Sequence, residues 1–245
     1  MPYVRAWFLL LLLSPSIGAA ELLRLVADPW PPFNDHRLPN NGLASDLVQQ
    51  ALSRAGYRTE YVEVPWERAV LSLRRGEQDV LINAWYSRER TYFGHFSQPY
   101  LINRIRFLQR KGAGIVFDRI ADLYPHSIAV VRGYAYTSAF DHDARLQRVG
   151  VNSFEIAARM LHAGRVQLAL EDELVARYQL GRELAPLRDE LEFLPKPLSE
   201  NGLRILVRLS HPHHQEIAQR FDEAIKAMQA DGSYNETMRR HGMAN

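Results

Sequence analysis

The sequence predicts an α/β protein of two lobes, each an open and mostly parallel sheet flanked by helices, with a two-strand hinge between them. Strand patterns alternate with amphipathic helical patterns, which is typical of parallel sheets covered by helices. One helix–glycine–strand unit occurs twice, over 67–84 and 154–170, which predicts two lobes rather than one longer sheet. Two soft segments, 111–114 and 195–202, mark where the chain could cross between the lobes.

Residues 1–20 have the pattern of a secretory signal peptide. Arg5 precedes an apolar run over 6–13, and small residues follow over 18–20. The apolar run is too short to span a bilayer, so a retained membrane anchor is the weaker interpretation. We expect cleavage after Ala20 and a mature protein in the periplasm.

Composition excludes several classes of function. The chain has no cysteine, which excludes disulfides, thiolate metal sites and a lipid-modified cysteine. Loss of Arg5 with the signal peptide lowers the formal net charge from +2 to +1, and no basic block stands out, so we expect no nucleic-acid partner. The histidines of 211–214 lack the spacing and acidic partners of a metal site. We expect a surface loop there, and no metal or other cofactor.

The first part of the mature chain predicts a strand, a helix and a second strand. The strand over 22–27 runs into Asp-Pro-Trp-Pro-Pro-Phe at 28–33, whose prolines exclude a helix or a central strand. Apolar residues on one face predict a helix over 42–56, ended by a glycine. Alternation predicts the next strand over 57–64, which Pro65 breaks.

The repeated unit gives each lobe a buried strand. A helix over 67–75 with a following glycine leads to the strand 80–84, and a helix over 154–163 leads in the same way to 168–170. A last long amphipathic helix is predicted over 214–228.

We expect residues 21–110 and 200–245 to form lobe 1, and 111–199 to form lobe 2. Two crossings of the chain would make the first and last thirds one lobe and the middle the other. Ligands in open α/β sheets bind beyond the carboxyl ends of the strands, so the cleft between the lobes is the expected site.

The segment that follows strand 80–84 carries the strongest functional signal. Trp85 and Tyr86 come first, then Ser87 as a candidate helix N-cap, and Arg90 falls in the first helical turn. The positive end of the helix dipole disfavours a cation there, so Arg90 looks like a group that receives an anion. The alternative is that Arg90 pairs with a nearby carboxylate and does nothing else.

Six segments in order resemble one known family, the small extracellular solute-binding proteins of the polar amino acid type (family 3), which are periplasmic receptors of ABC importers. The segments are 28–33, 42–47, 69–79, 89–100, 164–173 and 231–234. Each alone is a weak signal, but their order spans nearly the whole mature chain. The resemblance implies the type II periplasmic binding fold, whose two lobes close on a ligand.

The resemblance also implies roles for single residues. Arg90 matches the arginine that grips a ligand α-carboxylate, and Asp172 matches the acid of lobe 2 that receives the α-ammonium. Trp30 and Trp66 match residues that sandwich the ligand side chain, although both could belong to the lobe core. The planar guanidinium of arginine suits a carboxylate in a two-bond geometry, which supports the first role physically.

The opposing acid is left open by the sequence. Asp172 lies at the carboxyl end of the second repeated strand, as Ala84 to Tyr86 do in the first, so the two ends would face each other. Strand alternation allows either Asp172 or both Glu171 and Glu173 to face the cleft.

Two departures from the family pattern keep the ligand open. Small hydroxyl residues are usual before the arginine, whereas this chain has Ala84, Trp85 and Tyr86. A glycine followed by two threonines or serines is usual in lobe 2, whereas this chain has Gly133 and Tyr134 followed by Ala135 and Tyr136. The pocket is therefore expected to be smaller, or shaped for a flat, aromatic or non-α-amino ligand.

We expect a non-catalytic, monomeric receptor for a small zwitterion or organic anion, serving an ABC permease or a membrane sensor. One alternative is an enzyme of the cyclohexadienyl dehydratase type on the same fold, which needs a general acid over the leaving hydroxyl. Asp at position 172 argues against it, whereas Glu171 and Glu173 keep it open. A second alternative is a stand-alone ligand sensor, which could act only through a signalling partner.

Overall fold

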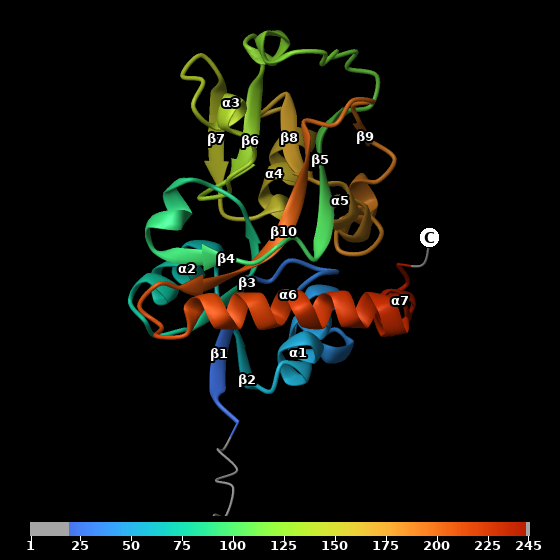
Figure 1. Cartoon of the computed structure of the whole chain (residues 1–245). Coiled ribbons are helices and arrows are strands. Elements are labelled where there is room, and N and C mark those ends of the chain that lie inside the picture. Colours follow the sequence, from blue (N-terminus) through green and yellow to red (C-terminus); the bar gives the residue numbers. More distant parts are fainter. Residues whose placement is uncertain (1–19, 244–245) are drawn as a thin grey trace, which may run out of the picture.

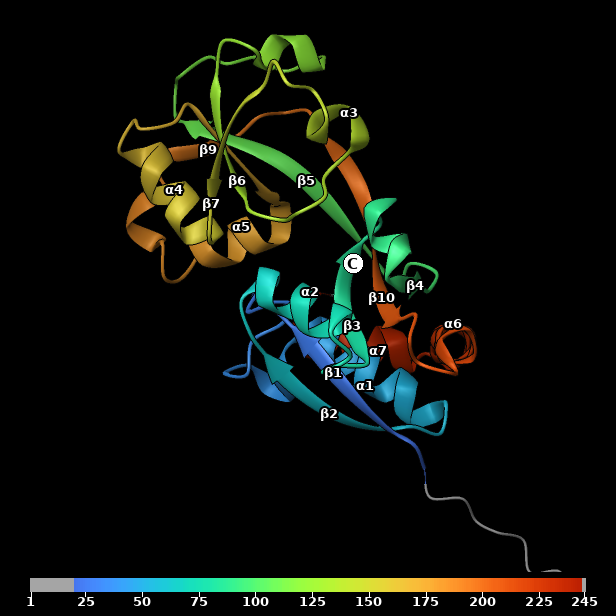
Figure 2. The same cartoon turned by 90° about the vertical axis from the view of Figure 1, so that its left-hand side faces the viewer.

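The computed structural model describes residues 20–243, which form two lobes joined at a narrow waist (Figures 1 and 2). Lobe 1 contains the strands β1 (Leu22–Ala27), β2 (Arg58–Glu63), β3 (Val80–Trp85) and β4 (Gly94–Phe96). Lobe 2 contains the strands β6 (Ser127–Val131), β7 (Gln147–Val151), β8 (Leu168–Asp172) and β9 (Leu191–Phe193). The expected signal peptide falls on residues outside the described part of the chain, apart from Ala20.

Helices cover both lobes. Those of lobe 1 are α1 (Leu43–Arg54), α2 (Trp66–Arg74), α6 (His214–Asp231) and α7 (Ser233–Arg240). Those of lobe 2 are α3 (Ser138–Asp141), α4 (Phe154–His162) and α5 (Glu173–Leu180). Short 3-10 turns occupy Pro39–Asn41, Glu89–Tyr92, Ile120–Leu123 and Ala185–Leu187. No helix within 20–243 is long and apolar enough to cross a bilayer.

The predicted fold class is confirmed, with one refinement of the sheet. Strands β2, β1 and β3 pair in parallel in lobe 1, and β8, β6 and β7 do so in lobe 2. The two triplets belong to one continuous sheet, because the antiparallel strands β10 and β5 lie between them in the order β2-β1-β3-β10-β5-β8-β6-β7.

The hinge is formed by the two longest strands, β5 (Leu101–Arg110) and β10 (Ser199–Arg208), which run side by side through the waist (Figure 2). β5 pairs with β10 as far as Ile105 and with β8 from Ile105 onward. The soft segment 111–114 therefore follows the far end of β5 in lobe 2. We propose that residues 21–110 and 200–245 form lobe 1 and that 111–199 form lobe 2, with β5 exchanging partners five residues before 110.

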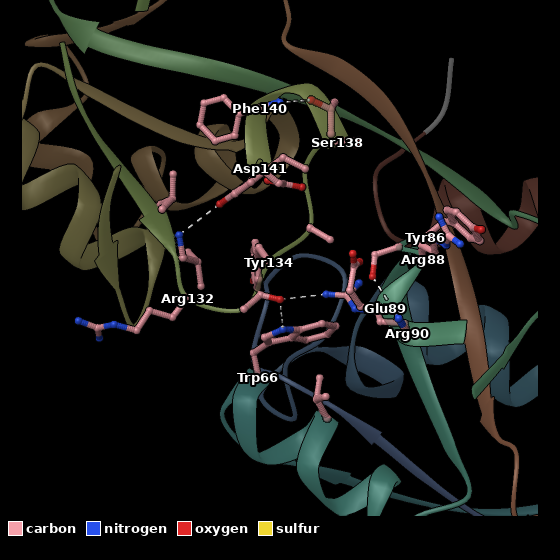
Figure 3. Close-up of a pocket in the computed structure, with 18 of the residues that line it drawn as sticks. Trp66, Tyr86, Arg88, Glu89, Arg90, Arg132, Tyr134, Ser138, Phe140 and Asp141 are labelled. Atoms are coloured by element: carbon pink, nitrogen blue, oxygen red, sulfur yellow. Dashed lines mark hydrogen bonds between the residues drawn. The ribbon is translucent and has the colours of Figure 1, made fainter. Parts of the chain in front are cut away.

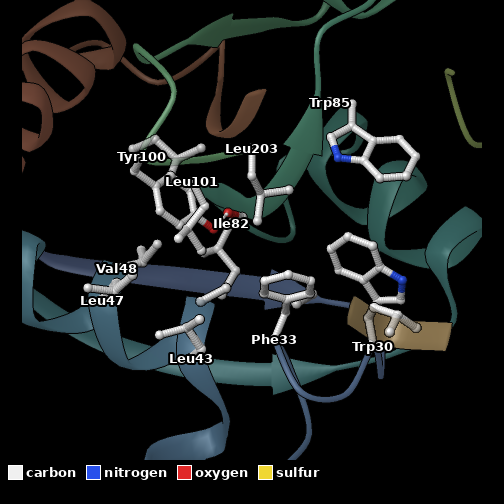
Figure 4. Packing of buried hydrophobic residues seen from close by; sticks show 14 of the residues in the cluster. Trp30, Phe33, Leu43, Leu47, Val48, Ile82, Trp85, Tyr100, Leu101 and Leu203 are labelled. Carbon is white, nitrogen blue, oxygen red and sulfur yellow. Dashed lines mark hydrogen bonds between the residues drawn. The ribbon is translucent and has the colours of Figure 1, made fainter. Parts of the chain in front are cut away.

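Packing explains why the predicted helices form where they do. The apolar stripe of α1 is fully buried against one face of the lobe 1 sheet (Figure 4), and α6 packs beside it on α1 and β10. Ala69 and Leu73 of α2 cover the opposite face. Each fully buried Leu or Phe side chain contributes about 1.5–3 kcal/mol to the free energy of folding, so helix packing stabilises both faces of this sheet.

Two local expectations differ from the structure. The helix expected after Ser87 is a single 3-10 turn, although the Ser87 hydroxyl does accept a hydrogen bond from the Arg90 amide at 3.3 Å. The expected surface loop at 211–214 is wrong for His211, which is 5% exposed and has its Nε2 3.3 Å from Glu21. The reason is that β10 and α6 meet here, and the turn between them packs under the start of β1.

Candidate ligand-binding site

The carboxyl ends of parallel strands from both lobes meet at the waist. Asp28 follows β1 and Trp85 ends β3, both in lobe 1. Glu171 lies near the end of β8, and Gly133 follows β6, both in lobe 2. This is the position in which open α/β sheets bind ligands, so the structure brings the candidate residues of the two lobes together.

Arg90 is buried at this junction and is 6% exposed. Its guanidinium donates hydrogen bonds to the main-chain oxygens of Trp85 and, at 3.0 Å, of Gly133. It also lies over the Trp66 ring, 4.8 Å from the ring centroid. Burial lowers the pKa of Arg90 to about 10, because a charge removed from water is disfavoured.

No carboxylate between residues 20 and 243 lies within 4.0 Å of the Arg90 guanidinium. The alternative that Arg90 serves only as half of an internal ion pair therefore has no support from the structure. The charges of Asp141, Asp28 and Glu89 act on Arg90 only from beyond 4.0 Å and do not offset its desolvation, since its pKa stays below the usual value. The arrangement suits a site that receives an anion.

Aromatic rings fill the space beside Arg90. The Tyr134 ring of lobe 2 contacts three indoles of lobe 1 edge-on, with centroid distances of 6.5 Å to Trp30, 5.6 Å to Trp66 and 5.4 Å to Trp85. These residues leave a residual cavity of about 10 Å³, which is room for about one water molecule. The small size of this cavity is therefore due to these rings.

Two polar residues that the sequence did not single out complete the cavity wall. Asp28 accepts hydrogen bonds from Asn83 Nδ2 at 2.7 Å and from the Tyr134 hydroxyl at 3.0 Å, and burial raises its pKa. Asn83 Oδ1 is buried without a hydrogen-bond partner. The available signal was a polar side chain inside or directly after a strand that is otherwise apolar and buried.

The three consecutive acids of lobe 2 have different surroundings. Glu171 is buried and accepts from Trp30 Nε1 of lobe 1 at 3.2 Å, while its Oε2 has no partner, and burial raises its pKa to about 8. Asp172 caps α5 by accepting from the amides of Leu174 and Val175, and burial raises its pKa to about 6. Glu173 pairs with arginines on the surface of lobe 2.

A second, open cleft of about 970 Å³ adjoins the small cavity at Arg90, and Figure 3 shows part of its lining. Trp66, Arg90 and Tyr134 line both this cleft and the small cavity. Tyr86 is 59% exposed, lines the cleft and packs on Phe96. At the mouth, Glu89 of lobe 1 lies 3.6 Å from His142 of lobe 2.

The remaining predicted site residues have clear positions. Trp30, Trp66, Trp85 and Tyr134 line the small cavity. Gly133 accepts from Trp66 Nε1 at 2.9 Å as well as from Arg90. Ala84 is fully buried in the lobe 1 core, and neither cavity is lined by Ala84 or Asp172.

The fold and the site together define a two-lobed ligand-binding receptor. The sequence profile of the bacterial extracellular solute-binding proteins, family 3, matches residues 23–244. The chain belongs to this family, which confirms the resemblance and the predicted class of function, a solute-binding receptor for transport or sensing. An extracellular or periplasmic location follows from the family.

The chain is similar to characterised proteins along most of its length. It is 26% identical over 235 residues to the L-arginine-binding protein of Pseudomonas aeruginosa, covering 91% of this chain and 88% of that protein.

Solved structures share the fold. A histidine kinase sensor domain with similarity to periplasmic binding proteins has a TM-score of 0.77 at 18% identity, covering 91% of this chain and 96% of that one. An ancestral arginine-binding protein bound to arginine has a TM-score of 0.75 at 22% identity, with coverages of 91% and 98%. The GluR0 ligand-binding core of Nostoc punctiforme, in complex with L-glutamate, has 0.74 at 16%, with coverages of 90% and 99%.

Proposed function

We propose that the protein is a non-catalytic periplasmic receptor whose lobes close on a small carboxylate or zwitterion anchored by Arg90. The observation that carries the proposal is a buried guanidinium with no carboxylate partner in 20–243. A ligand carboxylate would replace neutral carbonyl acceptors with a charged one. The bonds from the charged guanidinium to carbonyls are already charge-assisted, so what a ligand carboxylate adds is the counter-charge that the buried cation lacks within 4.0 Å among the described residues, and this favours the ligand.

The opposite wall suits a hydrogen-bond donor on the ligand. Asn83 lines the small cavity, its Oδ1 is buried with no hydrogen-bond partner within 20–243, and Asp28 lies beside it. A ligand ammonium or guanidinium would satisfy this oxygen. Asp172 remains our proposed family equivalent of the acid that receives an ammonium, although its Oδ1 already caps α5. The indole faces of Trp30 and Trp66 could stack on a flat or cationic group.

We propose further that the closed, monomeric receptor engages an ABC permease or a membrane sensor. A ligand favours the closed state when it contacts both lobes, and both cavities are lined by Arg90 of lobe 1 and Tyr134 of lobe 2. The name of the Pseudomonas aeruginosa relative makes L-arginine the first ligand to screen.

The test is a thermal-shift and native mass spectrometry screen of amino acids and organic acids on wild type and Arg90→Gln. We expect a carboxylate ligand to raise the melting temperature of wild type and to shift Arg90→Gln by less than a tenth as much at the same concentration. Arg159→Gln is the matched control, because Arg159 is an exposed lobe 2 arginine whose one salt-bridge partner among the described residues is Glu155. Equal shifts in all three proteins would remove Arg90 from the site.

A dehydratase is the second candidate, and Glu171 is the observation that favours it. A buried carboxyl with a pKa of about 8 is protonated at neutral pH and can act as a general acid. Turnover of prephenate, followed by the ultraviolet absorbance of phenylpyruvate and abolished in Glu171→Gln, would establish the enzyme. We expect no turnover.

A further inference from the structure

One segment of lobe 2 occupies the lobe 1 half of the site as a bound molecule would. Gly133 and Tyr134 follow β6 and contact Arg90, the three tryptophans and Asp28. Figure 3 shows Tyr134 beside Trp66 and Arg90. The contacts come in three parts, which are an oxygen, a ring and a hydroxyl. Each part meets a different group of lobe 1.

The oxygen is the main-chain carbonyl of Gly133. It accepts from Trp66 Nε1 at 2.9 Å and from Arg90 Nη2 at 3.0 Å, so two lobe 1 donors converge on one acceptor. This is the position that a carboxylate oxygen would take on Arg90. The backbone at Gly133 has φ +74°, and a Cβ there would lie 3.1 Å from Trp66 Cδ1. A glycine is therefore required to bring this carbonyl so close.

The ring and hydroxyl belong to Tyr134. The ring lies among Trp30, Trp66 and Trp85 with edge-to-face geometry, which is a favourable arrangement for aromatic pairs. The hydroxyl donates to Asp28 Oδ2 at 3.0 Å, on the far side of the ring from the Gly133 carbonyl. Lobe 1 thus recognises, in order, an acceptor oxygen, a flat ring and a donor.

We propose that Gly133 and Tyr134 act as an internal ligand of lobe 1, and that the external ligand is an aromatic acid with a hydrogen-bond donor at the end of the ring opposite its carboxylate. This inference rests on the proposed function, because it uses Arg90 as the carboxylate anchor. Binding of such an acid requires Tyr134 to leave the indoles. The apparent affinity of wild type is therefore the intrinsic affinity multiplied by the fraction of molecules in which Tyr134 is withdrawn, and it is low when that fraction is small.

The number of bonds between the Gly133 carbonyl and the Tyr134 ring determines which compound is the best probe. In the protein, the Gly133 carbonyl carbon is connected to the Tyr134 ring through an amide nitrogen, Cα and Cβ. The acid 4-(4-hydroxyphenyl)butanoate places a chain of the same length between its carboxylate and its phenol. The matched compound 4-phenylbutanoate lacks only the hydroxyl that would donate to Asp28.

The experiment measures the Kd of both acids by calorimetry on wild type, Tyr134→Ala and Tyr136→Ala. We expect Tyr134→Ala to bind 4-(4-hydroxyphenyl)butanoate at least tenfold more tightly than wild type does. The same variant should bind 4-phenylbutanoate about tenfold more weakly than it binds 4-(4-hydroxyphenyl)butanoate. Tyr136→Ala is the control, because Tyr136 belongs to the same aromatic cluster but its hydroxyl accepts from the Val131 amide within lobe 2. It should give no gain.

The outcomes separate this inference from the proposed function. If Tyr134→Ala is folded and binds neither acid better than wild type, or if Tyr136→Ala gains as much, the internal ligand is refuted while the Arg90 screen stands. If Tyr134→Ala gains tenfold and the gain survives Arg90→Gln in the same chain, the anchor is refuted instead. If Tyr134→Ala fails to fold, Tyr134→Phe replaces it, because it retains the ring and removes only the hydroxyl. We expect it to bind 4-(4-hydroxyphenyl)butanoate a few-fold more tightly than wild type. Equal affinity would refute the role of the Tyr134 hydroxyl in blocking the site.

Discussion

Glu171 should make the closed form of the protein less stable as pH rises. Its carboxyl lies between the lobes, and burial raises its pKa from 4.5 to about 8, with the neighbouring charges of Asp172 and Asp28 adding to the shift. The folded, closed protein therefore binds a proton that the unfolded chain releases above pH 4.5. Stability from this group is complete below pH 4.5 and is lost progressively up to pH 8.

The magnitude follows from the shift. Each pKa unit corresponds to about 1.4 kcal/mol, so the effect between pH 4.5 and 8 is at most about 5 kcal/mol. Opening of the lobes would rehydrate Glu171 and reduce this value, since its burial depends on contact with Trp30 of lobe 1. Glu171→Gln keeps the acceptor for the Trp30 and Asp172 N–H groups but cannot ionise. We expect it to match wild type at pH 5 and to be about 1–3 kcal/mol more stable at pH 8.

Thermal and urea unfolding of both proteins at pH 5, 6.5 and 8 provide the measurement. A gain of about 1 kcal/mol corresponds to about 2–4 °C in Tm for a chain of this size. The control is Glu173→Gln, because the pKa of Glu173 is lowered by its hydrogen bonds to Arg177 and Arg106 despite partial burial. That variant should lose stability at pH 8, the opposite sign. A difference between Glu171→Gln and wild type that stays constant with pH would refute the reasoning.

Two further predictions concern lobe 1 alone. Asp79→Asn should lower the free energy of unfolding by about 2 kcal/mol in urea at pH 7, because buried Asp79 accepts from both Arg24 and Arg208. These partners lower the pKa of Asp79, so the difference from wild type should shrink at pH 3. A difference that stays constant with pH would contradict the ion-pair explanation. Gly94→Ala should cost about 1–3 kcal/mol, since its Cβ would lie 2.5 Å from Leu206 Cγ. Adding Leu206→Val should recover part of this loss, and a loss unchanged by that second substitution would argue against the clash.

Local patterns were sufficient for the parallel strands β1, β2, β3 and β8 and for the helices α1, α2, α4 and α6, but they did not locate the hinge strands β5 and β10. The stripe of apolar residues in 42–56 predicted α1 (Leu43–Arg54), and the repeated helix–glycine–strand unit predicted α2 with β3 and α4 with β8. These signals are local because a helix or strand must bury one face, whichever partner it finds. The waist was harder to locate, since β5 looks like one ordinary strand and only its pairing shows that it serves both lobes.

In the candidate site, too, some residues could be predicted from the sequence and others only from the structure. The order of residues made Arg90 and the tryptophans candidates, because an arginine after a strand end and aromatics beside prolines are visible in it, and comparison with the family pattern added the unusual Gly133–Tyr134 pair. Only the tertiary structure decided that Tyr134 fills the space among those tryptophans, that Asp28 and Asn83 face it, and that Glu171 rather than Asp172 reaches lobe 1. These contacts join residues 49 to 141 positions apart, and the burial that perturbs Glu171 most arises only when its carboxyl meets Trp30 of the other lobe.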